Sequence, residues 1–310
     1  MDPIVNLDQL IDDLRGNPSR TVVIAAGQDP HSLQAAARAV SEEIADVALV
    51  GDRMRIEALC REKGLDAGGF NVIDEPDPVK AGALAVAMVR DGQADVLMKG
   101  LIGTADYMRL ILDKEKGLLP AGRVLSHVTV AEFPAERLQP ARLLFMADVA
   151  IIPLPDADTM VQILGYCTGA ARSFGIARPR VALIAASEKV SPRMPATVQA
   201  AEIARRWQAG ELREAVGEAE VAGPLSLDLA VSEEACAIKG FTSPVGGKAD
   251  VLVFPNIETG NVFYKTATRL AGARVAAVVA GAAAPCILTS RADSEESKFL
   301  SIAMGCRLAD

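Results

Sequence analysis

Seven short apolar runs, rich in β-branched residues, recur along the chain, and each ends at glycine, proline or serine. Runs of this length that stop at turn residues predict buried strands. They begin at Thr21 (TVVIAAG), Ala45 (ADVALVG), Ala94 (ADVLMKG), Ala147 (ADVAIIPLP), Arg180 (RVALIAAS), Ala249 (ADVLVFP) and Arg274 (RVAAVVAG).

Stretches with helical spacing separate these runs, among them HSLQAAARAVSEEI, DPVKAGALAVAMVRDG, TADYMRLILDKEKG and NVFYKTATRLAGA. Strands and helices in alternation predict βαβ units and a mostly parallel sheet, so the expected fold class is α/β. Ligands of such sheets bind at the carboxyl ends of the strands, and these ends are where we look for a site. The acidic N-terminus, broken by polar residues, predicts an amphipathic helix.

The segment from Ala131 to Arg142, AEFPAERLQPAR, contains two prolines and several charges. This composition predicts either a crossing between two domains or a long surface loop. A length of 310 residues likewise allows two compact units or one large α/β domain.

Charge and cysteine content narrow the choice of partners and compartment. A net charge of -8 argues against a nucleic-acid partner, because binding a phosphate backbone needs concentrated Lys and Arg. The five cysteines are far apart and form no CxxC pair, which is typical of free thiols in a reducing compartment, so we expect a cytoplasmic protein. The longest apolar stretch, from Val275 to Leu288, contains Pro285 and is too short to span a bilayer, so no membrane partner is expected.

The segment CILTSRADSEESKFLSIAM is the richest in candidate chemistry. Ser290 and Arg291 follow an apolar strand, and Asp293 is expected to cap the next helix, with Glu296 completing a capping box. Backbone N–H groups, the helix dipole and a guanidinium at such a place suit an anion. The alternative is a well-capped helix whose Arg291 only pairs with Asp293.

A second candidate is VLMKGLIGTADYMRLIL. Lys99 follows a strand, Thr104 is expected to cap the next helix, and Arg109 lies on that helix. Asp106 and Arg109 share a helix face, so an ion pair between them is the alternative to a binding role.

A third candidate is VFPNIETGNVFYK, in which Asn256, Glu258 and Asn261 stand between a strand and a helix. Polar groups again gather at the carboxyl end of a strand, although a domain or subunit contact explains them nearly as well.

Other chemistries have weaker support. His31 and His127 are far apart and lack ligand-like spacing, so no metal site is predicted, and for His127 a core or capping role is at least as well supported as catalysis. The chain has neither a GxGxxG motif after the first strand nor a GxxxxGK[ST] phosphate loop, which weakens dinucleotide and nucleotide-triphosphate readings.

Taken together, these segments resemble the phosphate acetyl/butyryltransferase family. The resemblance covers most of the chain from about Asp77 to Met304, and several unlike motifs occur in one order. The motifs are MKGLIGTADYMR, LSHV, AEIARRWQAGEL, AGPLSLDLAV, KGFTSPVGGKADVLVFPNIETGNVFYK, AGARVAAVVAGAAAPCILTSRADS and SIAM.

The resemblance implies two α/β/α domains with an active-site cleft between them, similar to isocitrate and isopropylmalate dehydrogenases. Residues 1–128 with 282–310 would form the first domain, and residues 129–281 an inserted second domain. It also implies a homodimer or a higher homo-oligomer, no metal and no permanently bound cofactor, with coenzyme A or acyl-CoA as a substrate.

The resemblance also assigns site residues. Ser290 and Arg291 match a Ser-Arg pair beside the reacting acyl phosphate, and Arg109 matches an arginine that holds phosphate. Ser297 stands where acetyl-specific members carry an aspartate proposed to help deprotonate the coenzyme A thiol, so Glu296 beside it is a candidate base, with Asp293 nearby. The remaining residues that would line or shape the cleft are Lys99, Thr104, Ser126, Asn256, Glu258, Asn261 and Lys265.

The implied reaction is direct transfer of a short acyl group, acetyl to butyryl, in a ternary complex. A coenzyme A thiolate attacks the carbonyl of an acyl phosphate and inorganic phosphate leaves. Many butyryl-type relatives carry an asparagine where this chain has Ile152 or Pro153, and another in the motif written here KVSPRMP. The alternatives are a metal- and NAD-dependent oxidoreductase of the related fold and a non-catalytic protein that binds coenzyme A or acyl phosphate.

Overall fold

The computed structural model describes residues 3–16, 20–290 and 293–309, and the chain forms two compact units. Unit 1 comprises Met1–Leu7 with Ser126–Val275, and unit 2 comprises Asp8–Leu125 with Ala276–Asp310. The first residues group with unit 1 because Ile4 N donates to the Phe174 carbonyl at 2.9 Å and Leu7 N to the Glu132 carboxylate at 2.9 Å. The domains expected from the sequence, residues 1–128 with 282–310 and residues 129–281, differ from these at the N-terminus, because Met1–Leu7 group with unit 1. The other expected boundaries lie a few residues away from those of the units.

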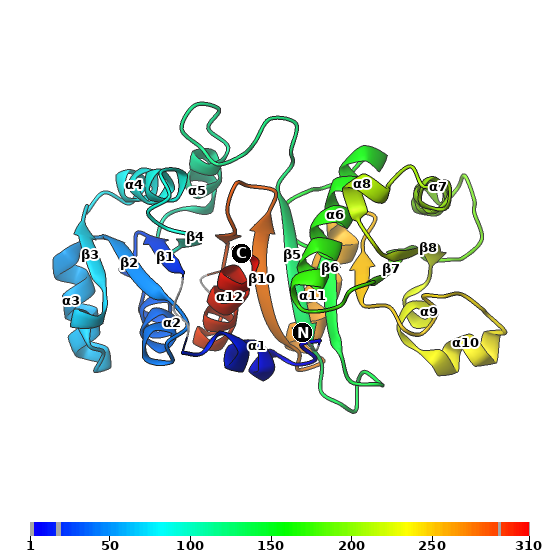
Figure 1. Ribbon diagram of the computed structural model, residues 1–310, viewed down its shortest axis with the longest axis horizontal. Coiled ribbons are helices and arrows are strands. Elements are labelled where there is room, and N and C mark those ends of the chain that lie inside the picture. The colour runs from blue at the N-terminus through cyan, green and yellow to red at the C-terminus, as the bar shows by residue number, and fades with distance from the viewer. Residues whose placement is uncertain (1–2, 17–19, 291–292, 310) are drawn as a thin grey trace. The chain divides into compact units, whose positions relative to one another are not determined.

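The strands of unit 2 lie in the order β3-β2-β1-β4-β11-β10 (Figure 1). Every neighbouring pair is parallel except β10 and β11, so the carboxyl ends of β1, β4 and β11 meet at one edge. The strands are β1 (Thr21–Ala25), β2 (Asp46–Gly51), β3 (Asn71–Asp74), β4 (Val96–Lys99), β10 (Arg274–Ala280, from Ala276 in this unit) and β11 (Cys286–Ile287).

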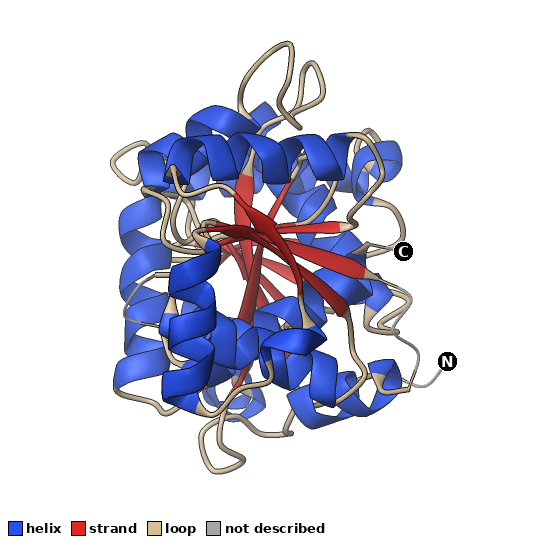
Figure 2. Cartoon of the chain, turned by 90° about the vertical axis from the view of Figure 1, so that its left-hand side faces the viewer, coloured by secondary structure: helices blue, strands red, loops and turns tan. Residues whose placement is uncertain are grey.

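Helices cover both faces of these strands (Figure 2). They are α1 (Leu7–Leu14), α2 (Pro30–Ser41), α3 (Arg53–Lys63), the 3₁₀ turn η1 (Ala67–Gly69), α4 (Pro78–Arg90), α5 (Thr104–Ile111) and α12 (Glu295–Leu308). α2 packs on α12, and α4 packs on α5. α12 is the most enclosed of these helices, because every residue from Lys298 to Cys306 is buried. The amphipathic helix expected at the N-terminus is α1, which buries Leu7 and Leu10.

The strands of unit 1 lie in the order β5-β6-β9-β7-β8, with β5 antiparallel to β6 and the other pairs parallel. They are β5 (Ser126–Glu132), β6 (Leu143–Ala147), β7 (Arg180–Ile184), β8 (Glu220–Leu225) and β9 (Val251–Val253). The helices are α6 (Ala157–Ser173), α7 (Pro195–Gln208), α8 (Arg213–Val216), α9 (Leu227–Val231), α10 (Glu233–Lys239) and α11 (Ile257–Arg269).

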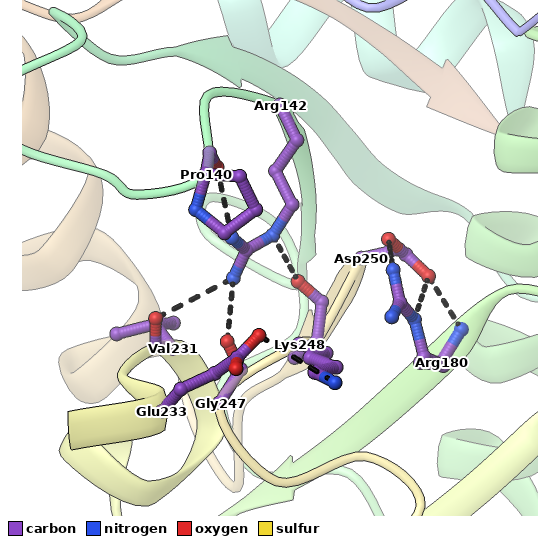
Figure 3. A network of polar contacts seen from close by, with 9 residues as sticks. Pro140, Arg142, Arg180, Val231, Glu233, Gly247, Lys248 and Asp250 are labelled. Atoms are coloured by element: carbon purple, nitrogen blue, oxygen red, sulfur yellow. Dashed lines mark hydrogen bonds and ion pairs between the residues drawn. The ribbon is translucent and has the colours of Figure 1, made fainter. Parts of the chain in front are cut away.

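Two arginines join segments of unit 1 that are distant in sequence (Figure 3). Arg180 forms a two-pronged pair with Asp250, with both N–O distances 2.9 Å. Arg142 donates instead to backbone carbonyls at 3.1–3.5 Å, those of Pro140, Val231, Gly247 and Ala249. Burial lowers the pKa of Arg142 from its ordinary value, but the surrounding carbonyls satisfy its donors.

Six of the seven predicted strands lie where the apolar runs place them, as β1, β2, β4, β7, β9 and β10, and the four predicted helices are α2, α4, α5 and α11. The strand predicted from Ala147 is wrong. Strand β6 ends at Ala147, and the next residues leave the sheet because the Asp148 carboxylate accepts the N–H groups of Ala150 and Ile151, both at 2.7 Å.

The proline-rich segment from Ala131 to Arg142 belongs to unit 1. Its first residues end β5, and the rest is the loop that leads into the antiparallel β6. It is therefore the surface loop of the two alternatives, not a crossing between the units. Across the described ranges of the chain, no helix is both long and apolar enough to cross a membrane.

Candidate functional site

The carboxyl edge of unit 2 is built around a close backbone approach. Gly100 N donates to the Ala25 carbonyl at 2.9 Å, and Leu101 N to the Ala26 carbonyl at 2.8 Å. A Cβ atom on Gly100 would lie 2.3 Å from the Ala26 carbonyl oxygen, closer than real Cβ atoms approach. Only glycine therefore lets the segment after β4 pass so close to the end of β1.

Two polar side chains are enclosed at this edge. Lys99, the last residue of β4, is buried, and its Nζ donates to the Gly100 carbonyl at 3.2 Å. The hydroxyl of Tyr107 lies 3.1 Å from the Leu97 carbonyl and 3.2 Å from that of Ile287, so it bridges β4 and β11. Burial raises the pKa of Tyr107 well above its ordinary value, which keeps the hydroxyl a donor. Both side chains therefore bond backbone carbonyls in the interior next to this edge.

Helix α5 starts differently from the prediction. Its N-cap is Gly103, in an extended conformation, and Thr104 is the first helical residue and is exposed. The prediction that Thr104 caps the helix is therefore wrong, because the chain turns one residue earlier. On the same helix, Arg109 pairs with Asp106 at 2.7 Å, and the arginine side chain is 73% exposed. The ion pair is formed, while a phosphate-binding role for Arg109 stays a prediction.

The loop before α12 also corrects the predicted cap. The N-cap is Ser294, whose hydroxyl accepts from Ser297 N at 3.2 Å, and Asp293 instead accepts from Ser290 N at 2.7 Å. The expected capping box of Asp293 and Glu296 is wrong because the helix starts one residue later than it requires. Ser290 and Glu296 are exposed, whereas Arg291 lies outside the described residues.

A buried lysine next to this loop was not predicted. The Nζ of Lys298 lies 2.7 Å from Asp29 Oδ2 and 3.1 Å from Ser32 Oγ. Burial by itself would raise the pKa of Asp29, but the hydrogen bonds from Lys298 and Ser32 outweigh it, and the pKa is lowered. Asp29 is thus held as a carboxylate opposite a lysine ammonium.

In unit 1, Ser126 lies beside Asp148 because β5 runs antiparallel to β6, so the start of one strand adjoins the end of the other. The buried Asp148 carboxylate accepts from Ser126 Oγ and His127 N, both at 2.9 Å, as well as from the two N–H groups of its own loop. Four donors thus surround one carboxylate, which fixes the turn after β6.

The start of α11 lies against the same turn. Asn256 is the N-cap, accepting from Thr259 N at 2.9 Å, and Asn261 Nδ2 donates to the Val149 carbonyl at 2.9 Å. A Cβ atom on Gly260 would lie 2.1 Å from the Asp148 carbonyl oxygen, so the helix packs directly on the loop. Glu258 and Lys265 are exposed on α11. Of the predicted binding residues, Asn256 and Asn261 therefore hold the local backbone, and Ser126 holds the Asp148 carboxylate.

His127 is a buried side chain of β5. Its Nδ1 lies 3.2 Å from Thr129 Oγ1, and its ring meets that of Tyr264 edge to face. In the part of the chain that the structure describes, no three His, Cys, Asp or Glu side chains are grouped as a metal ion would require.

The predicted residues fall into two sets. Lys99, Thr104, Arg109, Ser290 and Glu296 lie on the β4–α5 and β11–α12 segments of unit 2, and Ser126, Asn256, Glu258, Asn261 and Lys265 lie around β5, β9 and α11 of unit 1. Sequence reasoning missed Asp148 and Lys298. For Asp148 a signal was present, since it is a lone charge within the apolar run ADVAII, whereas Lys298 directly follows the polar segment SEES and does not stand out from it.

Comparison with known proteins places this arrangement in a family. Residues 6–80 and 77–306 match the family described as "Phosphate acetyl/butaryl transferase". The phosphate butyryltransferase of Clostridium acetobutylicum is 40% identical over 306 residues, 99% of each chain. The phosphate acetyltransferase of Thermotoga maritima is 38% identical over 303 residues, 98% of this chain and 99% of the other.

Solved structures agree with the sequence match. The branched-chain phosphotransacylase from Enterococcus faecalis superimposes with a TM-score of 0.81 at 33% identity, covering 94% of this chain and 99% of that one. A 4-hydroxythreonine-4-phosphate dehydrogenase from Klebsiella pneumoniae has a TM-score of 0.52 at 14% identity, a likeness of fold alone. The fold is that of a phosphotransacylase. The chain belongs to the phosphate acetyl/butyryltransferase family.

Proposed function

We propose that this protein is a phosphate acyltransferase that moves a short acyl group, acetyl to butyryl, reversibly between coenzyme A and inorganic phosphate. The observation that carries the proposal is the match over 99% of both chains to a phosphate butyryltransferase. The dehydrogenase likeness concerns the fold alone, so the oxidoreductase alternative is not taken further.

The proposed chemistry is a single displacement. The coenzyme A thiolate attacks the carbonyl carbon of an acyl phosphate, a C–S bond forms, the C–O bond to phosphate breaks, and phosphate leaves with the electron pair. A thiol pKa of about 8.5 is close enough to neutral that modest help from a base such as Glu296 supplies thiolate. No permanently bound cofactor takes part in this scheme, and its reactants and products are coenzyme A, acyl-CoA, phosphate and acyl phosphate.

The roles of single residues belong to the same proposal. Ser290 donates to the reacting centre, and Arg291 and Arg109 hold the phosphoryl oxygens, because a guanidinium matches phosphate geometry in a two-pronged contact. The exposure of Ser290, Glu296 and Arg109 supports these roles. Thr104, Glu258 and Lys265 are exposed as well and are open to direct contact with substrate. Lys99, Asn256 and Asn261 act through the backbone that they hold, and Ser126 through the Asp148 carboxylate.

Location and assembly complete the proposal. All five cysteines are free and buried, which suits a reducing cytoplasm. A homodimer or a higher homo-oligomer remains a prediction, which sedimentation of the purified protein would test.

The experiment is an assay of acetyl-, propionyl-, butyryl- and branched acyl-CoA with phosphate, following loss of the thioester absorbance. We expect phosphate-dependent release of coenzyme A with at least one short chain. Arg291→Ala should lower turnover at saturating substrates on the order of a hundredfold to a thousandfold, the usual effect of losing one preorganised contact to a developing charge. Binding of coenzyme A without phosphate-dependent release would instead support the non-catalytic alternative.

A further inference from the structure

Lys298 and Asp29 form a buried ion pair across unit 2. The side chains of Lys298 and Asp29 are only 4% and 14% exposed, and their N–O distance is 2.7 Å. They come from the first turns of two adjacent helices, α12 and α2 (Figure 1). Because β1 and β11 are both parallel to β4, these helices begin at the same edge of the sheet. The pair therefore joins the β1–α2 connection to the β11–α12 connection.

The energetics of such a pair favour a role in geometry over one in stability. Taking two charges out of water costs several kcal/mol per ion, and replacing a buried pair by apolar groups is often neutral or stabilising by about 1–4 kcal/mol. The rest of this helix interior is apolar or small, including Phe299, Leu300 and Ile302. The pair fixes the orientation of the two side chains, because Asp29 also accepts from Ser32 N at 2.9 Å and from Ser32 Oγ at 2.6 Å. The ammonium thus binds a carboxylate that is itself fixed.

Two hydrogen bonds, joined through the peptide bond between Asp293 and Ser294, connect Lys298 to Ser290. Lys298 N donates to the Ser294 carbonyl at 3.2 Å, and the Ser294 hydroxyl caps α12. The preceding residue, Asp293, holds Ser290 N at 2.7 Å. We propose that Lys298, together with Asp29, is a positioning residue that holds the start of α12 in place and, through Asp293, the backbone of Ser290 for the phosphate group of the substrate. The inference rests on the proposed acyl transfer and adds a residue to it.

A matched control lies at the far end of the same helix. Arg307 Nη1 pairs with Asp13 Oδ2 at 2.9 Å, with the arginine side chain 11% exposed, so α12 is tied to α1 by a second charged contact. This contact lies in the last turn of α12, away from the Ser290 loop. Removing either pair loosens the helix, but only the pair at the start should alter phosphate use.

The test uses full-length protein and three variants of the pair: Lys298→Met, Asp29→Asn and the double variant that combines them. The control variant is Arg307→Met. For Lys298→Met, kcat/KM for phosphate should fall on the order of tenfold to a hundredfold, as misplaced reacting groups cause, while the KM for acyl-CoA changes less than about twofold. The double variant leaves neither charge buried and unpaired, so its Tm should return towards wild type while kcat/KM for phosphate stays low. Arg307→Met should lower Tm and keep wild-type kcat/KM.

Two results would overturn the inference. If the double variant regains both Tm and kcat/KM, or if Arg307→Met loses phosphate use equally, the pair only stabilises the fold. If Lys298→Met fails to fold, Ser32→Ala takes its place, with an expected fall in kcat/KM of about two- to tenfold for one lost hydrogen bond, and wild-type kinetics there would refute the role. A wild-type protein inactive with every acyl-CoA would refute the proposed function itself.

Discussion

The hydroxyl of Ser126 donates a 2.9 Å hydrogen bond to the carboxylate of Asp148, and both side chains are fully enclosed. Ser126→Ala removes one of four donors from a buried charge, so the free energy of unfolding should fall by about 1.5–3 kcal/mol, the usual value for a hydrogen bond to a charged group. Urea unfolding measures it. The control is Ser41→Ala, whose hydroxyl bonds a carbonyl on an exposed helix end and should change stability by less than about 0.5 kcal/mol. Unchanged stability with lost activity would make Ser126 a substrate contact instead.

Arg109 and Arg205 have similar surroundings, so Arg205 is a suitable control for separating a binding role of Arg109 from an effect on stability. Each makes an exposed ion pair three residues away on its own helix, with Asp106 at 2.7 Å and with Glu202 at 2.8 Å. Such pairs contribute only about 0–1 kcal/mol, so neither alanine variant should change the urea midpoint greatly. If Arg109 holds phosphate, Arg109→Ala should lower kcat/KM for phosphate at least about a hundredfold, and Arg205→Ala should leave it intact. Equal kinetics for the two variants would remove Arg109 from the site.

Gly100 is expected to tolerate no side chain. Gly100→Ala would place a Cβ atom 2.3 Å from a backbone oxygen, so β1 and β4 must separate at the site edge. We expect a loss of about 1–3 kcal/mol or more in the free energy of unfolding, as overpacking in a tight core causes. Gly169→Ala, in the middle of α6 and without a neighbouring atom within 4 Å, should stabilise by about 0.5–1 kcal/mol. A Gly100→Ala protein as stable as wild type would show that this backbone can yield.

The Asp228–Lys239 pair predicts a pH dependence. A hydrogen bond from Lys239 Nζ at 2.7 Å is the largest of the causes that lower the pKa of Asp228 to about 2. A folded pKa below the unfolded value of about 3.9 means that the stabilisation is complete above that pH and disappears as the pH falls towards 2. Both side chains are about half exposed, so solvent screening keeps the contribution small. Carboxyl NMR titration should show the pKa of Asp228 rising in Lys239→Met; an unshifted titration would rule out the pair in solution.

The apolar runs predict six of the eleven strands in the described residues, because a strand buried on both faces reads as a continuous apolar run, as in TVVIA of β1. The pattern failed after Ala147 because it cannot show that a single side chain will capture the backbone. Asp148 does this with two N–H groups of its own loop. The strand is LLFMA, which precedes it, whereas the apolar pattern favours the longer run ADVAIIPLP.

The candidate site also has parts that the sequence predicts and parts that it does not. The segments carrying Ser290 and Arg109 follow β11 and β4 as the sequence indicates, because strand ends and helix starts leave a local signature. The cap at Ser294 differs by one residue from the predicted Asp293, since both residue types can cap a helix, and here the Asp293 carboxylate accepts from Ser290 N, three residues earlier. The pairing of Lys298 with Asp29 joins positions 269 residues apart and has no local signature.

The discontinuity of unit 2 sets an order for folding during synthesis. Unit 1 has all its strands once Val253 has been made, and Arg142 can then reach carbonyls 89 to 107 positions further along the chain. Strands β1 to β4 leave the ribosome earlier, yet they lack the helix whose residues from Lys298 to Cys306 fill their core. The first part of the polypeptide to emerge is therefore among the last to become stable, and a nascent chain stalled before α12 should carry one protease-resistant unit and one sensitive unit.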